Sequence, residues 1–203
     1  MASFRLEKAL ARGGARLIAG VDEVGRGALF GPVVAAAVIL PPEWLVRRPP
    51  AWVSGVVDSK LLSGARRSVL AASLSREAAA VGLGLATARE IDDLNIHRAT
   101  RLAMVRALEN LARPPDVVLV DGFPLKDVNY RQMGVPRGDR ACRSIAAASI
   151  VAKVFRDGLI EALDGLYGGY GLARNKGYGT EEHIRSLRER GPSDLHRASF
   201  KIG

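Results

Sequence analysis

The stretch LIAGVDEVGRGALFGPVVAAAVIL, residues 17–40, contains the two segments on which the fold prediction depends. Its first part, residues 17–22, is a short apolar run that ends at an acidic pair, which predicts a buried strand. Its last part, residues 33–40, is apolar throughout and is stopped by Pro41 and Pro42, which predicts a second, fully buried strand. We therefore expect both segments to lie in the core of the protein.

Outside this stretch, helical and strand-like patterns alternate. The expected helices cover residues 63–80, 95–111 with Asn95 as cap, 144–166, and a last segment capped by Thr180. Further strands are expected at residues 81–88, where Gly82 and Gly84 indicate close backbone approach, and at residues 117–121. Residues 43–55 and 122–140 are expected to be loops. The alternation predicts an α/β fold with a mixed sheet.

The composition indicates a globular protein with an unusual charge. With 203 residues, 48% of them hydrophobic and 25% charged, the chain suits one domain and excludes a disordered or fibrous protein. Lys and Arg number 30 against 21 Asp and Glu, and the resulting net charge of +9 favours a polyanionic partner, with nucleic acid first and anionic membrane second. The alternative, that arginine usage reflects genome composition, does not explain why the acidic residues fail to balance it.

No segment has the pattern of a signal peptide or a membrane span. Residues 1–16 lack a continuous apolar region, and the uncharged run at residues 27–42 is shorter than the ~20 residues that span a bilayer. Cys142 is the single cysteine, which excludes a disulfide framework and suits a reducing compartment. We expect a soluble, cytoplasmic monomer with no membrane partner.

Acidic residues follow two of the predicted strands. Asp22 and Glu23 end the first, Asp121 ends the strand at 117–121, and Asp139 lies in a loop just before the helix at 144. Strand ends are where α/β sheets place their sites, and carboxylates held close together favour a cation such as Mg²⁺ or Mn²⁺. Two such ions roughly 4 Å apart can clamp a phosphodiester. Taken singly, each acid has the alternative interpretation of a surface cap or turn former.

A glycine-flanked arginine, Gly25-Arg26-Gly27, directly follows the acidic pair. The glycines permit close approach of the backbone, and Arg26 can donate a charge-assisted fork of hydrogen bonds to phosphate. By itself this tripeptide is usually only a turn. Next to the acids, it is typical of a substrate clamp beside a metal site.

Together these motifs resemble those of the ribonuclease HII family, in order along nearly the whole chain. The matching segments are GVDEVGRG (20–27), GPVVAAAV (31–38), DSK (58–60), EIDDLNI (90–96), VDG (120–122), GD (138–139), AAASIVAK (146–153), RD (156–157), KGYGT (176–180) and HRASF (196–200). The resemblance implies an RNase H-like fold, with a mixed central β-sheet flanked by helices and a small helical C-terminal region. It implies one type 2 RNase H catalytic domain over residues 1–203, of which about 165–203 contact the substrate.

The resemblance also implies an activity. Members hydrolyse the RNA strand of RNA–DNA hybrids and cut on the 5′ side of single ribonucleotides embedded in duplex DNA, leaving 3′-OH and 5′-phosphate ends, in ribonucleotide excision repair and RNA primer removal. The implied cofactors are two divalent ions, Mg²⁺ or Mn²⁺, and the implied partners are these duplexes.

Individual roles follow from the same resemblance. The catalytic and metal-binding carboxylates are Asp22, Glu23, Asp121 and Asp139. Gly25, Arg26 and Gly27 match the loop that reads the ribose 2′-OH and its flanking phosphates. Tyr178 matches the tyrosine that packs on the sugar after the ribonucleotide, and we expect Lys60 to contact phosphate. Without the resemblance, a packed loop aromatic would be the preferred interpretation of Tyr178.

The chain departs from the family pattern in a few places. Phe30 stands where a smaller residue is expected, and Asn175 stands where histidine is common. The sequence stops soon after HRASF, so we do not expect the tail by which some relatives bind the replication clamp. It also lacks the extra N-terminal domain of ribonuclease HIII, which favours HII.

Several polar residues keep two interpretations. Ser149, Lys153 and Asp157 share one stripe of the helix at 144–166, so they either face the substrate or include a structural Lys153–Asp157 pair, which we favour for Asp157. The histidines, His97, His183 and His196, are too scattered to predict a zinc site. We expect His196 to order the C-terminus or contact the backbone.

Three other functions remain open. A metal-free ribonuclease that uses the 2′-OH as nucleophile needs acid–base side chains such as paired histidines. A non-catalytic, basic nucleic-acid-binding module fits the net charge. A metal-dependent nuclease indifferent to the sugar fits the acidic cluster.

Overall fold

The computed structural model describes residues 2–126 and 128–201, which fold around a five-stranded sheet of order β3-β2-β1-β4-β5. The strands are β1 (Ile18–Val24), β2 (Val33–Ile39), β3 (Ala80–Ala86), β4 (Val117–Asp121) and β5 (Gln132–Val135). β2 pairs antiparallel with β1 and β3, whereas β4 runs parallel to β1 and β5. The prediction of an α/β fold with a mixed sheet is therefore confirmed.

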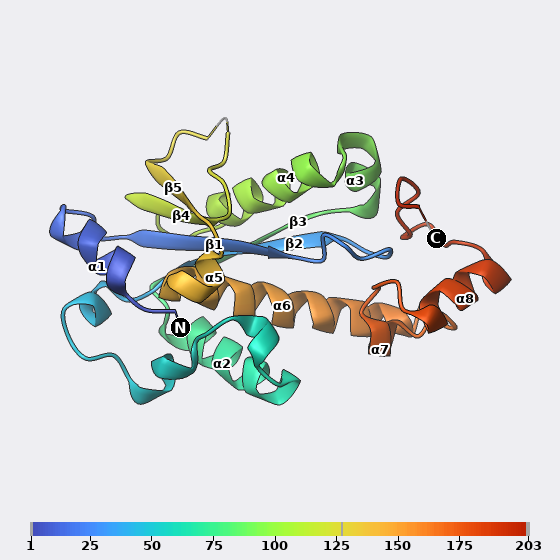
Figure 1. The fold of residues 1–203 in the computed structure, drawn as a ribbon, viewed down its shortest axis with the longest axis horizontal. Coiled ribbons are helices and arrows are strands. Elements are labelled where there is room, and N and C mark those ends of the chain that lie inside the picture. Colours follow the sequence, from blue (N-terminus) through green and yellow to red (C-terminus); the bar gives the residue numbers. More distant parts are fainter. Residues whose placement is uncertain (1, 127, 202–203) are drawn as a thin grey trace.

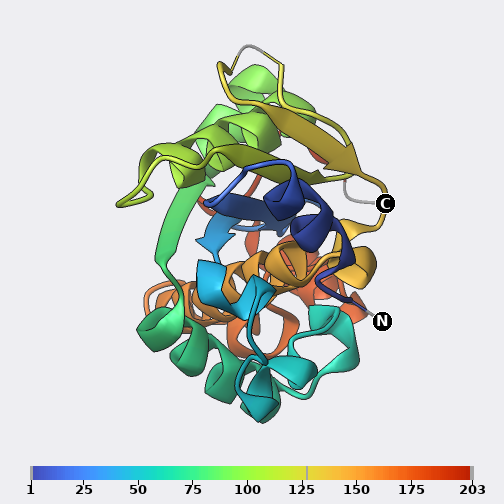
Figure 2. The same cartoon turned by 90° about the vertical axis from the view of Figure 1, so that its left-hand side faces the viewer.

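Helices cover both faces of the sheet. The helices are α1 (Arg5–Arg12), α2 (Gly64–Glu77), α3 (Ala88–Leu94), α4 (Ile96–Glu109), α5 (Gly138–Ala141), α6 (Arg143–Asp164), α7 (Leu172–Asn175) and α8 (Glu181–Arg190). Figure 1 shows α4 along one face, and α6, with α2 outside it, along the other. Figure 2 shows the sheet between these two layers. None of the described helices is long and apolar enough to cross a membrane.

Small residues allow the helices to lie close to the sheet. All seven residues of β2 are buried. A Cβ atom at Gly20 would lie 2.1 Å from the Ser144 carbonyl carbon at the start of α6, and one at Gly84 would lie 2.2 Å from the Ala103 carbonyl oxygen of α4. The predicted close backbone approach at Gly82 and Gly84 is confirmed. The sheet is therefore closely packed between two helices, α6 on one face and α4 on the other.

Helix caps follow the sequence, but two expected loops contain regular structure. The Asn95 side chain accepts hydrogen bonds from the His97 and Arg98 N–H groups, and Thr180 accepts one from His183. The prediction of a loop at residues 122–140 is wrong, because β5 and α5 lie there; β5 is short and has no fully buried residue, so it lacks an apolar run. Residues 43–55 include two short 3-10 helices.

The C-terminal region lies beyond the end of the sheet, where α6 continues past the strands (Figure 1). Its own apolar cluster is formed by Phe30, Ile160, Tyr170, Leu172 and Leu187. The Phe30 ring is fully buried and packs edge-on against Tyr167 and His196. The large side chain of Phe30 thus packs between the sheet and the small helices α7 and α8.

Candidate active site

Three of the four predicted carboxylates meet where β1 and β4 lie side by side. The parallel register pairs Val21 with Val120, which places Asp22 beside Asp121. Ligand oxygens of Asp22, Glu23 and Asp121 all lie within 4.8 Å of one another. The first strand does not end at the acidic pair as predicted; β1 continues to Val24, so both acidic residues lie within the strand.

The three carboxylates form an acidic cluster, Asp22, Glu23 and Asp121, in which burial and nearby negative charge raise the pKa values of Asp22 and Glu23. Asp22 is buried, and its pKa lies well above the usual value because of desolvation and the charges of Glu23 and Asp121. The pKa of Glu23 is raised by burial, against the opposing effect of Arg26, whose guanidinium lies 3.2 Å away. An all-oxygen donor set that is short of positive charge fits a divalent cation such as Mg²⁺ or Mn²⁺.

Asp139 lies close to the acidic cluster but outside the group within 4.8 Å. It belongs to the short helix α5 rather than to a loop, which corrects the prediction. The preceding residue anchors α5 to β4, since the Gly138 N–H donates a 2.6 Å hydrogen bond to Asp121 Oδ1. Burial, followed by the charges of Asp58 and Asp121, raises the pKa of Asp139. All four acids, with Lys60 and Tyr178, line one hollow of ≈ 350 Å³.

The residues expected to bind nucleic acid border a second hollow of ≈ 550 Å³, which shares Glu23, Lys60 and Tyr178 with the first. Its walls include Gly25, Arg26, Gly27, Lys60, Tyr178 and Phe200. Gly25 has a φ of +91°, so a side chain there would be strained. The structure thus brings every predicted site residue to one end of the sheet.

Two cationic side chains of α6 lie against the Tyr178 ring. The Lys153 ammonium lies 5.6 Å from the ring centroid and the Arg156 guanidinium 5.4 Å. The preceding turn is shaped by Asn175, whose side chain donates to the Tyr170 carbonyl (2.7 Å) and accepts from the Gly177 N–H (2.8 Å). Asn175 is buried, so its role in this structure is to form the turn.

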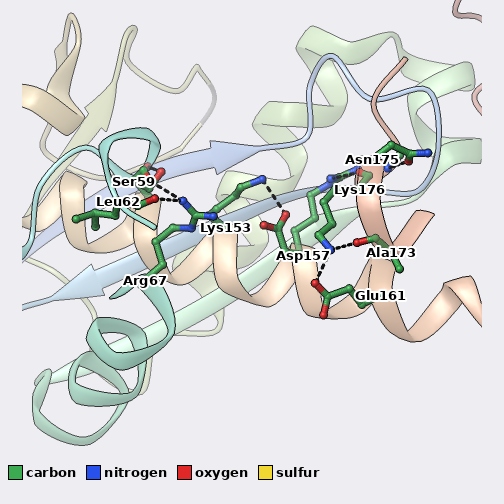
Figure 3. Close-up of polar contacts among 12 residues, drawn as sticks. Ser59, Leu62, Arg67, Lys153, Asp157, Glu161, Ala173, Asn175 and Lys176 are labelled. Atoms are coloured by element: carbon green, nitrogen blue, oxygen red, sulfur yellow. Dashed lines mark hydrogen bonds and ion pairs between the residues drawn. The ribbon is translucent and has the colours of Figure 1, made fainter. Parts of the chain in front are cut away.

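The polar residues on one stripe of α6, Ser149, Lys153 and Asp157, do not all have the same surroundings. Ser149 contacts Asp22 and lies 3.0 Å from the Ser59 hydroxyl, so it belongs to the site. Lys153 and Asp157 form an ion pair of 2.8 Å, visible in Figure 3, which confirms the predicted pair on this helix; the structural role of Asp157 stays a prediction. Figure 3 also shows Lys176 directed toward Glu161 and the Ala173 carbonyl.

Two of the three histidines, which lie apart in the sequence, meet in the structure. His183 Nε2 and His196 Nε2 lie 3.1 Å apart, because α8 and the C-terminal segment pack together. His196 Nδ1 accepts a 2.9 Å hydrogen bond from the Ser193 N–H, which confirms the backbone contact expected of this histidine. His97 lies elsewhere, with Nδ1 3.5 Å from Arg26 Nη2.

Sequence reasoning missed Phe200 and two buried arginines, Arg156 and Arg197, although each lies in one of the family motifs, RD (156–157) or HRASF (196–200). Arg156 is fully buried and Arg197 is 3% exposed. Arginine usually indicates surface, so composition and periodicity give no signal for its burial. The aromatic Phe200, close to the chain end in HRASF, was the available clue for the wall of the second hollow.

Known proteins share both the sequence and the fold. The family model described as ribonuclease HII matches residues 19–202. A ribonuclease HII of Moorella thermoacetica is 51% identical over 98% of this chain and 94% of the relative, and one of Enterococcus faecalis is 47% identical over 97% and 74%.

Solved structures give the same assignment. Ribonuclease H2 of Pyrococcus horikoshii superimposes with a TM-score of 0.74 at 26% identity, covering 92% of this chain and 94% of that one. The ribonuclease HII of Archaeoglobus fulgidus, solved as a complex with PCNA, gives 0.73 at 25% identity, covering 91% and 95%. The predicted RNase H-like fold is therefore confirmed, and the chain belongs to the ribonuclease HII family and is an RNase H enzyme.

Proposed function

We propose that this protein cuts duplex DNA on the 5′ side of a single embedded ribonucleotide, as well as the RNA strand of RNA–DNA hybrids, by a two-metal-ion mechanism. The observation that carries the proposal is the adjacency of two features. The acidic cluster, within 4.8 Å, shares Glu23 with a hollow bordered by Gly25, Arg26 and Gly27. Hydrolytic chemistry and recognition of the sugar thus occupy one continuous site.

The acidic cluster and Asp139 are the residues that hold the ions. When bound, Mg²⁺ or Mn²⁺ supplies Lewis-acid stabilisation of the phosphodiester and lowers the pKa of an attacking water. The chain's own part is to fix the oxygens: Asp22 accepts the Glu23 N–H (2.8 Å), and Asp121 accepts the Gly138 N–H. These bonds orient both carboxylates before any ligand arrives.

The second hollow orients the ribonucleotide. The 2′-OH distinguishes RNA from DNA locally, and the loop at residues 25–27 is the element that reads it. Arg26 and Lys60 contact the flanking phosphates, and the Tyr178 ring packs against the sugar that follows the ribonucleotide. The net charge of +9 attracts the duplex and makes its affinity depend on salt.

Three duplexes test the proposal in the presence of Mg²⁺: all DNA, an RNA–DNA hybrid, and DNA with one ribonucleotide. We expect no cleavage of the first, cleavage of the second at many positions, and cleavage of the third at the phosphodiester 5′ to the ribonucleotide. Equal cleavage of all three would show a nuclease indifferent to the sugar. Binding of all three without any cleavage would show a non-catalytic module.

A further inference from the structure

Arg197 fastens the loop at residues 25–27 from inside the protein. Its guanidinium donates to three main-chain carbonyl oxygens: Nη2 to Gly25 (2.7 Å), Nη1 to Arg26 (3.0 Å) and Nε to Gly31 (3.0 Å). At 3% exposure, the side chain is almost fully removed from water. The fork of a guanidinium suits three fixed acceptors, which a single ammonium cannot reproduce.

The direction of these bonds sets the direction of the loop amides. In a trans peptide the C=O and the following N–H point to opposite sides. Since the Gly25 and Arg26 carbonyls point at Arg197, the N–H groups of Arg26 and Gly27 point away from it. Across residues 2–126 and 128–201, no acceptor is hydrogen-bonded to either N–H. Two free donors are thus presented side by side on the loop that borders the second hollow.

The segment that carries Arg197 is itself hydrogen-bonded to helix α3. Asp92 on α3 accepts the N–H groups of Ala198 (3.0 Å) and Ser199 (2.9 Å). Arg156 completes the frame from α6, with hydrogen bonds to the carbonyls of Phe30 (3.1 Å) and Lys176 (2.9 Å). The loop at residues 25–27 is therefore set by the C-terminal segment, far away in sequence.

We propose that Arg197 is a positioning residue for ribose recognition: it holds the Gly25 and Arg26 carbonyls so that the Arg26 and Gly27 amides face the 2′-OH. This inference rests on the proposed role of the loop at residues 25–27. Arg197 touches no substrate itself. Its loss is expected to reduce discrimination between ribose and deoxyribose more than it reduces binding to DNA in general.

The test measures binding rather than turnover. In the full-length Asp22→Asn protein, which should bind without cutting, dissociation constants are measured for duplex DNA with and without one ribonucleotide. The dissociation constant for the all-DNA duplex divided by that for the duplex with one ribonucleotide is the ratio that reports 2′-OH recognition. Arg197→Met should reduce this ratio by at least about tenfold, the worth of one or two hydrogen bonds, and Arg197→Lys should fall between Met and the parent.

Two further variants separate positioning from stability. Arg106→Met is the matched control, since Arg106 also donates to a main-chain carbonyl, that of Leu85 (2.8 Å), and to Glu90, away from the loop. It should lower the melting temperature and leave the ratio unchanged. Asp92→Ala, which loosens the Arg197 segment without emptying the core, should lower the ratio by roughly two- to threefold, less than one full hydrogen bond.

The outcomes distinguish the two proposals. A parent protein with no preference between the duplexes would contradict the proposed function of the loop. A parent with a clear preference that folded Arg197→Met or Arg197→Lys proteins retain would overturn the role of Arg197 alone. A ratio that falls equally in Arg106→Met would mean that general destabilisation is the cause.

Discussion

Two groups of buried charges lie at the same end of the sheet, and they differ in how their charge is satisfied. Arg156 and Arg197 donate to main-chain carbonyls, which are neutral dipoles already present in the fold. Burial and the nearby charge of Arg156 lower the pKa of Arg197 to about 9, so Arg197 stays charged at neutral pH. The acidic cluster contains mutually repelling carboxylates instead. One group is complete without a ligand, whereas the other needs a cation.

The largest effect should come from removing one charge of the acidic cluster. Asp22→Asn is expected to lower the cleavage rate by roughly 1000-fold or more, because a metal ligand contributes several kcal/mol to the transition state. Duplex binding should persist. Single-turnover cleavage of DNA with one ribonucleotide measures the loss, and an unchanged rate would mean that the site is misplaced.

Tyr178 lies between the buried arginines and the acidic cluster. Its ring packs against Arg156 and borders the hollow that the four acids line. Tyr178→Ala should slow cleavage at a single ribonucleotide by about 10- to 100-fold, in line with the loss of one stacking contact. Tyr178→Phe keeps the ring and should remain within about threefold of the parent, a change below one hydrogen bond. Equal losses in both variants would assign the effect to the hydroxyl.

Asp22→Asn should also stabilise the metal-free protein. A raised pKa in the folded state means that stability is complete below the unfolded value of about 3.9 and is lost as the pH rises through the folded value. At pH 7 the substitution removes the repulsion between the Asp22 carboxylate and its neighbours Glu23 and Asp121. The melting temperature should rise by roughly 2–4 °C for each kcal/mol regained.

Divalent ions should reverse the order of stability of the parent protein and the Asp22→Asn variant. Mg²⁺ or Mn²⁺ should raise the melting temperature of the parent protein and have little effect on Asp22→Asn, because a ligand stabilises the state that binds it. Differential scanning calorimetry with EDTA and with each metal provides both measurements. A parent protein that is unaffected by either ion would contradict the assignment of the acidic cluster as a metal site.

The smallest effect is expected on α6. Asp157→Asn removes the ion pair with Lys153, and such helix pairs contribute a few tenths of a kcal/mol. Cleavage should stay within about threefold of the parent, and the melting temperature within about 2 °C. A loss comparable to that of Asp22→Asn would instead place Asp157 among the catalytic acids.

The sequence predicted the parts of the molecule whose neighbours are close along the chain. Residues 17–22 and 33–40 are apolar enough to identify the central strands, and Asn95 caps its helix as expected. β5 and α5 were missed because a short, half-exposed strand and a four-residue helix carry no periodicity.

The contacts of the buried arginines could not be predicted for a different reason. Arg197 meets the Gly25 carbonyl across 172 residues, and the acceptor is main chain, so no residue type marks it. Likewise, the position of Asp139 depends on how α5 packs against β4. Motifs predicted which residues make up the candidate site, and tertiary packing determines which of them touch.

The central claim is that the acidic cluster acts through divalent ions, and one cleavage assay tests it directly. Duplex DNA with one ribonucleotide is incubated with Mg²⁺, with EDTA, and with Mg²⁺ restored, and the product ends are identified by mass. Cleavage should occur only with Mg²⁺ and leave a 3′-OH and a 5′-phosphate. A full rate in EDTA, or a cyclic phosphate at the product end, would contradict the account.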